Sequence, residues 1–181
     1  MLKLKQREEA LKAGFDLIMW TFEPLMRLNT YFNLNKLGAI FRSYYRNHYG
    51  MMDDSINYGL ESDRVKAEWW IKSRRVELKL AGKLKPPKLD ELLELGGEVV
   101  LNANNPVSYT SSELALVGLP SDLPSLRRKD PKRAFEWRQA VREVYEHYLS
   151  LGYIAVDMSE GYVILWKRKL EDVLNGEVPW R

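Results

Sequence analysis

The sequence predicts an α/β fold (α+β) in which a mixed, mainly antiparallel sheet carries helices on both faces. The nearly unbroken apolar run from Phe15 to Phe22 is typical of a central strand that is covered on both sides. Residues 64–71 alternate between apolar and polar side chains, which indicates a half-buried strand. Residues 134–151 carry an apolar stripe at helical spacing, which predicts an amphipathic helix. Such elements are expected to pack as layers around one core.

Two helices are expected to flank the first strand. Residues 2–13 predict a helix that ends at Gly14, because glycine adopts the left-handed conformation of a helix cap at little cost. A second helix is predicted over 24–37. Pro24 opens it, since its missing N–H would be unpaired in a first turn anyway, and Gly38 closes it. The apolar stripe of this helix is expected to comprise Leu25, Leu28 and Phe32.

Three strands are predicted in the first half. The strand 15–22 is expected at the centre, with the strands 39–45 and 64–71 antiparallel beside it. Alternation in the third strand places one set of side chains toward the core and the other toward solvent. The inward set is Val65, Ala67, Trp69 and Ile71, and the outward set is Arg64, Lys66 and Glu68.

The second half is predicted to be a separate α/β unit. We expect a first unit over 1–75 and a second unit over 89–181. A basic linker over 76–88, which includes Pro86 and Pro87, is expected to join them. Asp130 is expected to cap the long helix, with Pro131 in its first turn. The other elements predicted here are a helix at 89–95, strands at 98–101 and 114–117, and a hairpin of 153–158 and 162–168. The stripe of the long helix is Ala134, Trp137, Val141, Val144, Tyr148 and Leu151.

The composition excludes several classes of protein. The 181 residues include no cysteine, which excludes a disulfide framework, a thiolate nucleophile and a cysteine metal site. No run approaches the roughly 20 apolar residues of a membrane span, and lysine and glutamate interrupt the stretch where a signal peptide would be apolar. The sequence therefore predicts a cytoplasmic protein with no membrane partner. A net charge of +3 permits an anionic partner, such as a nucleotide cofactor or a nucleic acid.

Residues 4–71 carry an ordered set of short motifs that resembles one branch of the GNAT superfamily, the acyl-CoA N-acyltransferases. The first motifs form a strand, a sharp turn and a helix, and the later ones follow in a loop and the next strand. They are Gln6–Leu11, Trp20–Leu25, Asn29, Phe32–Asn33, Leu37–Ala39, Tyr45, Tyr49–Gly50, Asp54, Asn57, Gly59 and Ser62–Arg64.

This resemblance implies a GNAT-like three-layer sandwich that transfers an acyl group to an amine. The donor would be an acyl-CoA, either acetyl-CoA or succinyl-CoA, and the acceptor a small-molecule amine or an amino acid, with no metal. The helix asparagine Asn29, and with it Asn33 four residues later, would contact the cofactor. The alternative is that both asparagines cap local backbone, as this residue type readily does.

The chain departs from the family pattern ahead of the matching segment. The glycine-rich loop that holds the cofactor pyrophosphate at a helix N-terminus is not in this sequence, nor is the strand before it. Lys36 stands where the family has its general-acid tyrosine. We therefore expect either an N-terminally truncated piece of a longer enzyme or a cofactor-free interaction or scaffold protein derived from a GNAT domain.

The loop 46–63 holds the candidate catalytic residues. In the family this connection frames the acceptor site, and amine acylation needs a base to take the ammonium proton. His48, Tyr49 and Asp54 are the candidates for proton transfer. Asp53 and Arg64 are candidates for substrate binding, because a guanidinium can hold a carboxylate through two hydrogen bonds. The alternative is a solvated loop with ordinary surface charges.

Three further expectations concern partners. The basic stretch 72–88 permits nucleic-acid binding, but it lacks aromatic interleaving and is typical of a solvated linker, so no nucleic-acid partner is predicted. His147 lies in the last turn of the long helix, where a cation complements the helix dipole. An apolar strand at 15–22 without a preceding strand predicts a homodimer that buries its edge. The alternative is a monomer in which the segment 98–117 closes that edge.

Overall fold

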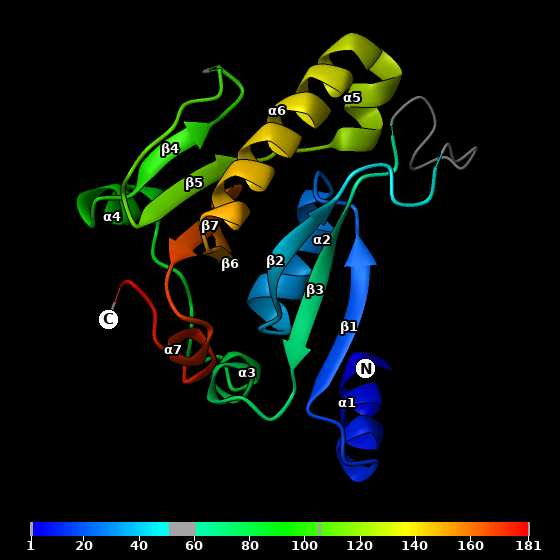
Figure 1. The fold of residues 1–181 in the computed structure, drawn as a ribbon, viewed down its shortest axis with the longest axis vertical. Coiled ribbons are helices and arrows are strands. Elements are labelled where there is room, and N and C mark those ends of the chain that lie inside the picture. The colour runs from blue at the N-terminus through cyan, green and yellow to red at the C-terminus, as the bar shows by residue number, and fades with distance from the viewer. Residues whose placement is uncertain (1, 51–60, 105, 181) are drawn as a thin grey trace.

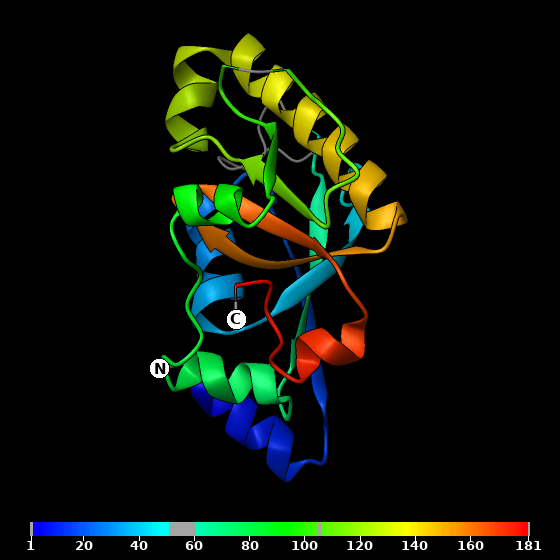
Figure 2. The ribbon, with the colours of Figure 1, turned by 90° about the vertical axis from the view of Figure 1, so that its left-hand side faces the viewer.

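The computed structural model describes residues 2–50, 61–104 and 106–180, and it is an α+β protein built on one mixed sheet. The seven strands lie in the order β1-β3-β2-β6-β7-β5-β4. Figures 1 and 2 show the sheet running through the molecule, with the long helix α6 lying across it. Neighbouring strands are antiparallel except β4 and β5, which are parallel.

The elements have the following bounds. The strands are β1 Leu17–Phe22, β2 Ile40–Tyr45, β3 Arg64–Trp70, β4 Glu98–Leu101, β5 Leu114–Gly118, β6 Tyr153–Ser159 and β7 Tyr162–Lys167. The helices are α1 Leu2–Lys12, α2 Arg27–Tyr31, the π-helix η1 Phe32–Lys36, α3 Arg74–Leu80, α4 Leu89–Glu94, α5 Leu123–Lys129, α6 Pro131–Ser150 and α7 Leu170–Leu174.

Strand β1 lies at an edge of the sheet, so the prediction that 15–22 is central was wrong. Among the described residues it pairs only with β3, and β2 pairs with β3 and β6 rather than with β1. Met19 is 55% exposed and Phe15 is 61% exposed. An apolar run identifies a strand but does not say how many neighbours the strand has, because strand order depends on long-range pairing.

Strand β3 is buried on both faces, which corrects the prediction that its polar side chains face solvent. The inward set is buried as predicted, with Val65, Trp69 and Ile71 fully so. The outward residues Arg64 and Glu68 are also buried, at 7% and 4% exposure. Glu68 accepts hydrogen bonds from Arg42 and Trp70, and these bonds compensate for the burial of its charge.

The helix predicted over 24–37 begins later and changes type. Residues 24–26 form a turn, α2 starts at Arg27, and the next five residues form the π-helix η1 before Gly38 at a φ of 75°. Leu25 is fully buried, but Leu28 is 78% exposed, so the predicted stripe was wrong at that position. The wider turn of a π-helix rotates the residues after it, and Leu34 and Leu37 carry the buried face instead.

Helix α1 lies at the end of the molecule, against β1 (Figure 1). Gly14 and Phe15 close it by donating to the carbonyls of Leu11 and Ala10, as predicted for a glycine cap. The helix has no buried residue, and Leu2 is 88% exposed. It therefore covers only part of β1.

The two predicted units share the sheet, because Phe41 in β2 pairs with Ala155 in β6. The stretch predicted as a basic linker contains most of helix α3, whose cap is Ser73. The segment 98–117 lies at the opposite edge of the sheet from β1, so the expectation that it closes the β1 edge was wrong.

The remaining elements of the second half are close to prediction. Asp130 caps α6 by accepting from the backbone N–H of Arg133 at 2.9 Å. The predicted stripe of α6 is buried, except that Leu151 is 48% exposed and lies past the helix end. The hairpin forms as β6 and β7. Helix α5 was not predicted, because its segment is rich in turn residues.

Helices cover both faces of the sheet. The larger core lies under α2, η1 and α6 and includes Leu34, Phe41 and Val141. The smaller core lies under α4 and α7 and includes Leu92, Val156 and Val173. No helix in the described part of the chain is long and apolar enough to cross a membrane.

Candidate functional site

Three of the predicted site residues come together at the start of the loop after β2. The Tyr49 hydroxyl lies 2.7 Å from Thr21 Oγ1, and the His48 ring lies 4.6 Å from the Tyr49 ring. The Arg64 guanidinium lies 5.2 Å from the same ring and bonds the carbonyl of Asp63. Asp53 and Asp54 fall outside the described residues.

The two predicted cofactor asparagines do not share an environment. Asn29 is exposed, whereas Asn33 is 4% exposed within the π-helix. A spacing of four residues places side chains on one face only in an α-helix, and η1 breaks that relation. Neither asparagine lines the hollows described below.

A buried network of charged side chains lies next to the loop after β2. Glu23 accepts from Arg138 at 2.5 Å and from Arg64 at 3.4 Å. The Tyr44 hydroxyl donates to Asp63 at 2.5 Å, and burial together with that carboxylate raises the Tyr44 pKa. These groups bond one another, which is what buried charges require, so their main role is structural.

Three adjoining cavities lie elsewhere, and residues of α2 and η1 line two of them. These three hollows, which we call the α2 groove, share lining residues. The inner hollow, which contains Lys79, shares Glu160 with the middle hollow, which contains Arg27. The middle hollow shares Asn102, Ala103, Arg133 and Trp137 with the outer hollow. Arg27 lines the middle hollow, and Tyr31 and Asn35 line the inner hollow.

Lys79 lies in the inner hollow, whose volume is about 420 Å³. Its amine contacts the Asp157 carboxylate on β6, and Arg75 approaches the same carboxylate to 3.8 Å. Burial lowers the pKa of Lys79 to about 8, although Asp157 partly opposes this. Burial also raises the pKa of Asp157, against the two cations beside it. Perturbed groups in a cavity are typical of functional sites.

Asn35 lines the same hollow and carries an unused acceptor. Its Nδ2 donates to the Met158 carbonyl at 2.7 Å, while its buried Oδ1 has no hydrogen-bond partner. Leaving a buried acceptor unpaired costs about 1–3 kcal/mol, so a ligand N–H or O–H that reaches it would bind favourably. Lys36 and Lys85 also line this hollow, and Glu160 is its one acidic lining residue.

Arg27 lines the middle hollow, whose volume is about 480 Å³. Its guanidinium packs over Gly161, where an added Cβ would come within 2.7 Å of the Arg27 Cζ atom. The acidic lining residues are already engaged: Asp122 caps α5, and Glu160 accepts from the backbone N–H of Leu89. The structure records no ion pair for Arg27 within the ranges that it describes.

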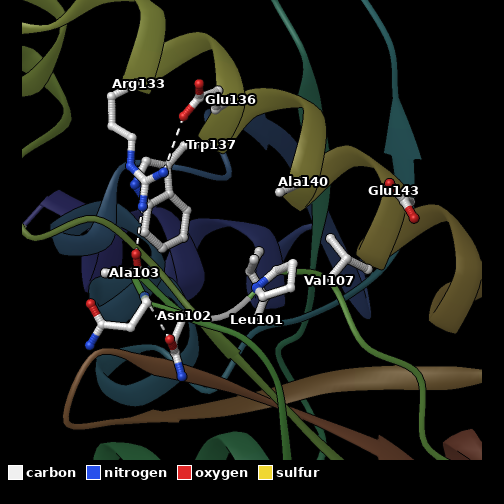
Figure 3. A pocket seen from close by; sticks show the side chains of 11 residues that line it. Leu101, Asn102, Ala103, Val107, Arg133, Glu136, Trp137, Ala140 and Glu143 are labelled. Atoms are coloured by element: carbon white, nitrogen blue, oxygen red, sulfur yellow. Dashed lines mark hydrogen bonds and ion pairs between the residues drawn. The ribbon is translucent and has the colours of Figure 1, made fainter.

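The outer hollow, about 490 Å³, lies where the carboxyl end of β4 meets α6 (Figure 3). Ligands of α/β proteins commonly bind outside such strand ends. Figure 3 shows the Arg133 side chain between the Glu136 carboxylate and the Ala103 carbonyl, which it bonds. The Trp137 indole lies beside this contact and lines the hollow.

Sequence reasoning missed the residues that line the α2 groove. Lys79 fell in a stretch interpreted as a linker, although Val76 and Leu80 have helical spacing and could have shown the helix. Arg27 and Asn35 belong to the predicted helix but carry no family motif. The described residues contain no group of three or more His, Asp or Glu side chains that could hold a metal ion.

Comparisons with known proteins add no family to this description. No family model, curated protein or solved structure matches the chain. The GNAT resemblance of residues 4–71 therefore stays a prediction.

Proposed function

We propose that the protein binds an acyl-CoA in the α2 groove and transfers its acyl group to an amine of a small molecule. The observation that carries the proposal is the buried, unpartnered Oδ1 of Asn35, a residue that lines one hollow together with Lys79. The pantetheine arm of coenzyme A offers amide N–H groups, and an asparagine carbonyl accepts such donors. The resemblance of residues 4–71 to acyl-CoA transferases favours the same ligand.

The charges along the groove support a long anionic ligand. Arg27 in the middle hollow offers a guanidinium to phosphate, which it can bind through two parallel N–H donors. Arg27 and Asn35 are eight residues apart, which corresponds to about 12 Å along a helix. That length suits a phosphate at one residue and a pantetheine amide near the other. Trp137 offers an aromatic surface beyond Arg27 for a planar heterocycle.

The inner hollow has the chemistry that the transfer needs. The acceptor nitrogen must lose a proton before it attacks the thioester carbonyl, and the coenzyme A thiolate then leaves. Lys79, with a pKa of about 8, is suited to exchange protons near neutral pH. Lys36 and Lys85 would attract an acceptor or an acyl group that carries a carboxylate. His48 and Tyr49 lie outside the three hollows, so they are not assigned to this step.

One observation favours a second candidate, a cofactor-free interaction protein. The edge of β1 and the surface of α1 expose apolar side chains, including Leu2, Phe15 and Met19. Exposed apolar edges of sheets are typical of surfaces that pair with other chains. The two candidates differ in one measurable property, the binding of acyl-CoA.

Isothermal titration calorimetry with acetyl-CoA and succinyl-CoA tests the proposal. We expect dissociation constants in the micromolar range for at least one of them, and release of free thiol when a panel of small amines is added. Asn35→Ala should weaken binding about tenfold, because it removes one buried hydrogen bond. Arg128→Ala, on the exposed face of α5, is the matched control and should leave binding unchanged. No heat with either ligand would overturn the proposal and favour the interaction protein.

A further inference from the structure

We infer that Lys79 is an acyl-accepting residue, whose amine attacks a thioester that enters the inner hollow and becomes an Nε-acyl-lysine. This inference deepens the proposed function, since it rests on a thioester reaching this hollow. An acylated Lys79 can no longer exchange protons with an acceptor, so the modification would stop the transfer. It assigns a modification site to a residue that the sequence placed in a linker.

The position of the amine carries the inference. Lys79 projects from α3 toward β6, lines the hollow and contacts the Asp157 carboxylate. Gly38, with a φ of 75°, lies so close that an added Cβ would meet the Lys79 Cβ and Cγ atoms at 3.0 Å. This contact and the ion pair hold the lysine stem and its amine in one place. Asn35 lies in the same hollow with an acceptor that can hold an N–H of the thioester.

Asp157 can take the proton that the amine must lose. The carboxyl is fully buried and burial raises its pKa, while burial lowers the pKa of Lys79. The two shifts bring the pKa values of the two groups closer together, so the carboxylate can relay the ammonium proton to water as the pH rises through 8.

The acylation then balances. The Lys79 nitrogen forms a bond to the thioester carbonyl carbon, the carbon–sulfur bond breaks, and the thiolate leaves with that bonding pair. The thiolate takes the second proton from the nitrogen, which gives a free thiol and an amide. The first proton passes through Asp157 to water, and the Asp157 carboxylate keeps Arg75, 3.8 Å away, as its counter-charge.

Two thioesters test the inference by peptide mass spectrometry. The protein is incubated at pH 8 with acetyl-CoA, or with S-acetyl-N-acetylcysteamine, which carries the thioester without the nucleotide. Lys5 and Lys132, both on exposed helix positions, serve as internal references. At pH 8 about half of an amine with a pKa near 8 is neutral, against well under 1% for an ordinary lysine. We expect Lys79 to gain the 42 Da acetyl group about tenfold faster than either reference.

The pH profile is a second readout. The groups that face Lys79 are Asp157 on β6, Arg75 on α3, Lys36 on η1, and Lys85 and Glu160 at the rim of the hollow. The rate should rise through pH 8 and then level off. Lys79→Arg keeps the positive charge and should remove the modified peptide. Circular dichroism checks that this variant folds. The comparison of Lys79 with Lys5 and Lys132 is made in the wild-type protein and does not depend on the variant.

The outcomes separate this inference from the proposed function. Acylation by both thioesters supports the two together. Acylation by the small thioester alone supports the inference and argues against coenzyme A binding in the groove. If calorimetry detects acyl-CoA binding but Lys79 reacts no faster than Lys5 with either reagent, the inference is wrong and the proposed function stands.

Discussion

Arg142 on helix α6 donates two parallel hydrogen bonds of 2.8 Å each to the carboxylate of Asp63, the residue before β3. The pair joins elements 79 residues apart in the sequence, and Asp63 is fully buried. The same carboxylate accepts from the backbone N–H of Asn47 at 2.8 Å and from the Tyr44 hydroxyl. Asp63 therefore fixes the loop after β2 to the long helix.

Asp63→Asn should destabilise the protein by about 3 kcal/mol at pH 7, because it removes the buried carboxylate from Arg142 and leaves it only Glu61, whose side chain is 42% exposed. Burial raises the pKa of Asp63, but the bonds from Arg142, Asn47 and Tyr44 outweigh burial and lower it overall. A lowered pKa stabilises the fold above the unfolded value near 4, and this contribution is lost as the pH falls through the folded pKa. Urea unfolding at pH 7 and at pH 3 measures both effects.

The control for this prediction is Glu146→Gln, which removes an exposed partner of Arg46. The two side chains of that pair are 62% and 32% exposed, and such surface pairs contribute at most about 1 kcal/mol. An unfolding midpoint at pH 7 that is the same for Asp63→Asn and wild type would contradict the role assigned to Asp63.

Local sequence patterns predicted most elements but not their order in the sheet. The cap at Asp130, the hairpin turn through Glu160 and Gly161, and the glycine cap at Gly14 each depend on a few neighbouring residues. The edge position of β1 depends on pairing across the whole chain, which no local pattern encodes. The polar face of β3 was misassigned because its charges find buried partners contributed by distant segments.

The α2 groove could not be predicted from the sequence for a similar reason. Arg27 and Asn35 lie in a predicted helix, but the π-turn sets which side chains share a face, and a helical pattern assumes the regular spacing. The Lys79 and Asp157 pair joins residues 78 positions apart. Neither residue type nor spacing indicates such a contact, so only the folded chain shows it.

Arg27→Ala should weaken acyl-CoA binding about tenfold, because a charge-assisted bond to phosphate contributes about 1.5 kcal/mol or more. Titrations with dephospho-CoA and with pantetheine show which part of the ligand Arg27 contacts. Pantetheine carries no phosphate, so the variant should bind it as the wild type does. Titration in increasing salt should show a shallower dependence for the variant, since one phosphate contact is lost. Equal affinities of the two proteins for acyl-CoA would remove Arg27 from the site.

Gly161→Ala tests the same residue from the opposite side of the groove. Gly161 has a φ of 98°, and its new Cβ would come within 2.7–2.9 Å of the Arg27 guanidinium atoms. We expect the guanidinium to be displaced and binding to weaken as in Arg27→Ala. Gly152→Ala is the control for glycine strain, because Gly152 has a φ of 85°, nothing lies within 4 Å of its added Cβ, and it does not line the groove. If both variants weaken binding equally, displacement of Arg27 is not the cause.

Gly38→Ala should lower both the stability and the reactivity of Lys79. A side chain at a φ of 75° costs about 1–2 kcal/mol, and the added Cβ would press on the Lys79 stem at 3.0 Å. The amine would then move relative to Asp157, so acetylation by S-acetyl-N-acetylcysteamine should slow. Peptide mass spectrometry measures it, with Lys5 as the reference. A variant that is less stable but acetylates Lys79 at the wild-type rate would show that Gly38 does not position the amine.

The last prediction is a homodimer that pairs two copies of β1. The strand Leu17–Phe22 has no charged residue and no proline, the usual devices that keep an edge from pairing, and within the described residues its second edge has no strand beside it. Two copies related by a two-fold axis would continue the sheet and cover Met19 and Phe15, which are 55% and 61% exposed. Light scattering at micromolar concentration should give about twice the chain mass of 21.2 kDa. Met19→Lys adds a charge to this edge and should return the mass to one chain, whereas Leu95→Lys, 49% exposed and far from β1, should remain dimeric. A wild-type mass of one chain at every concentration would mean that β1 does not pair with a second copy.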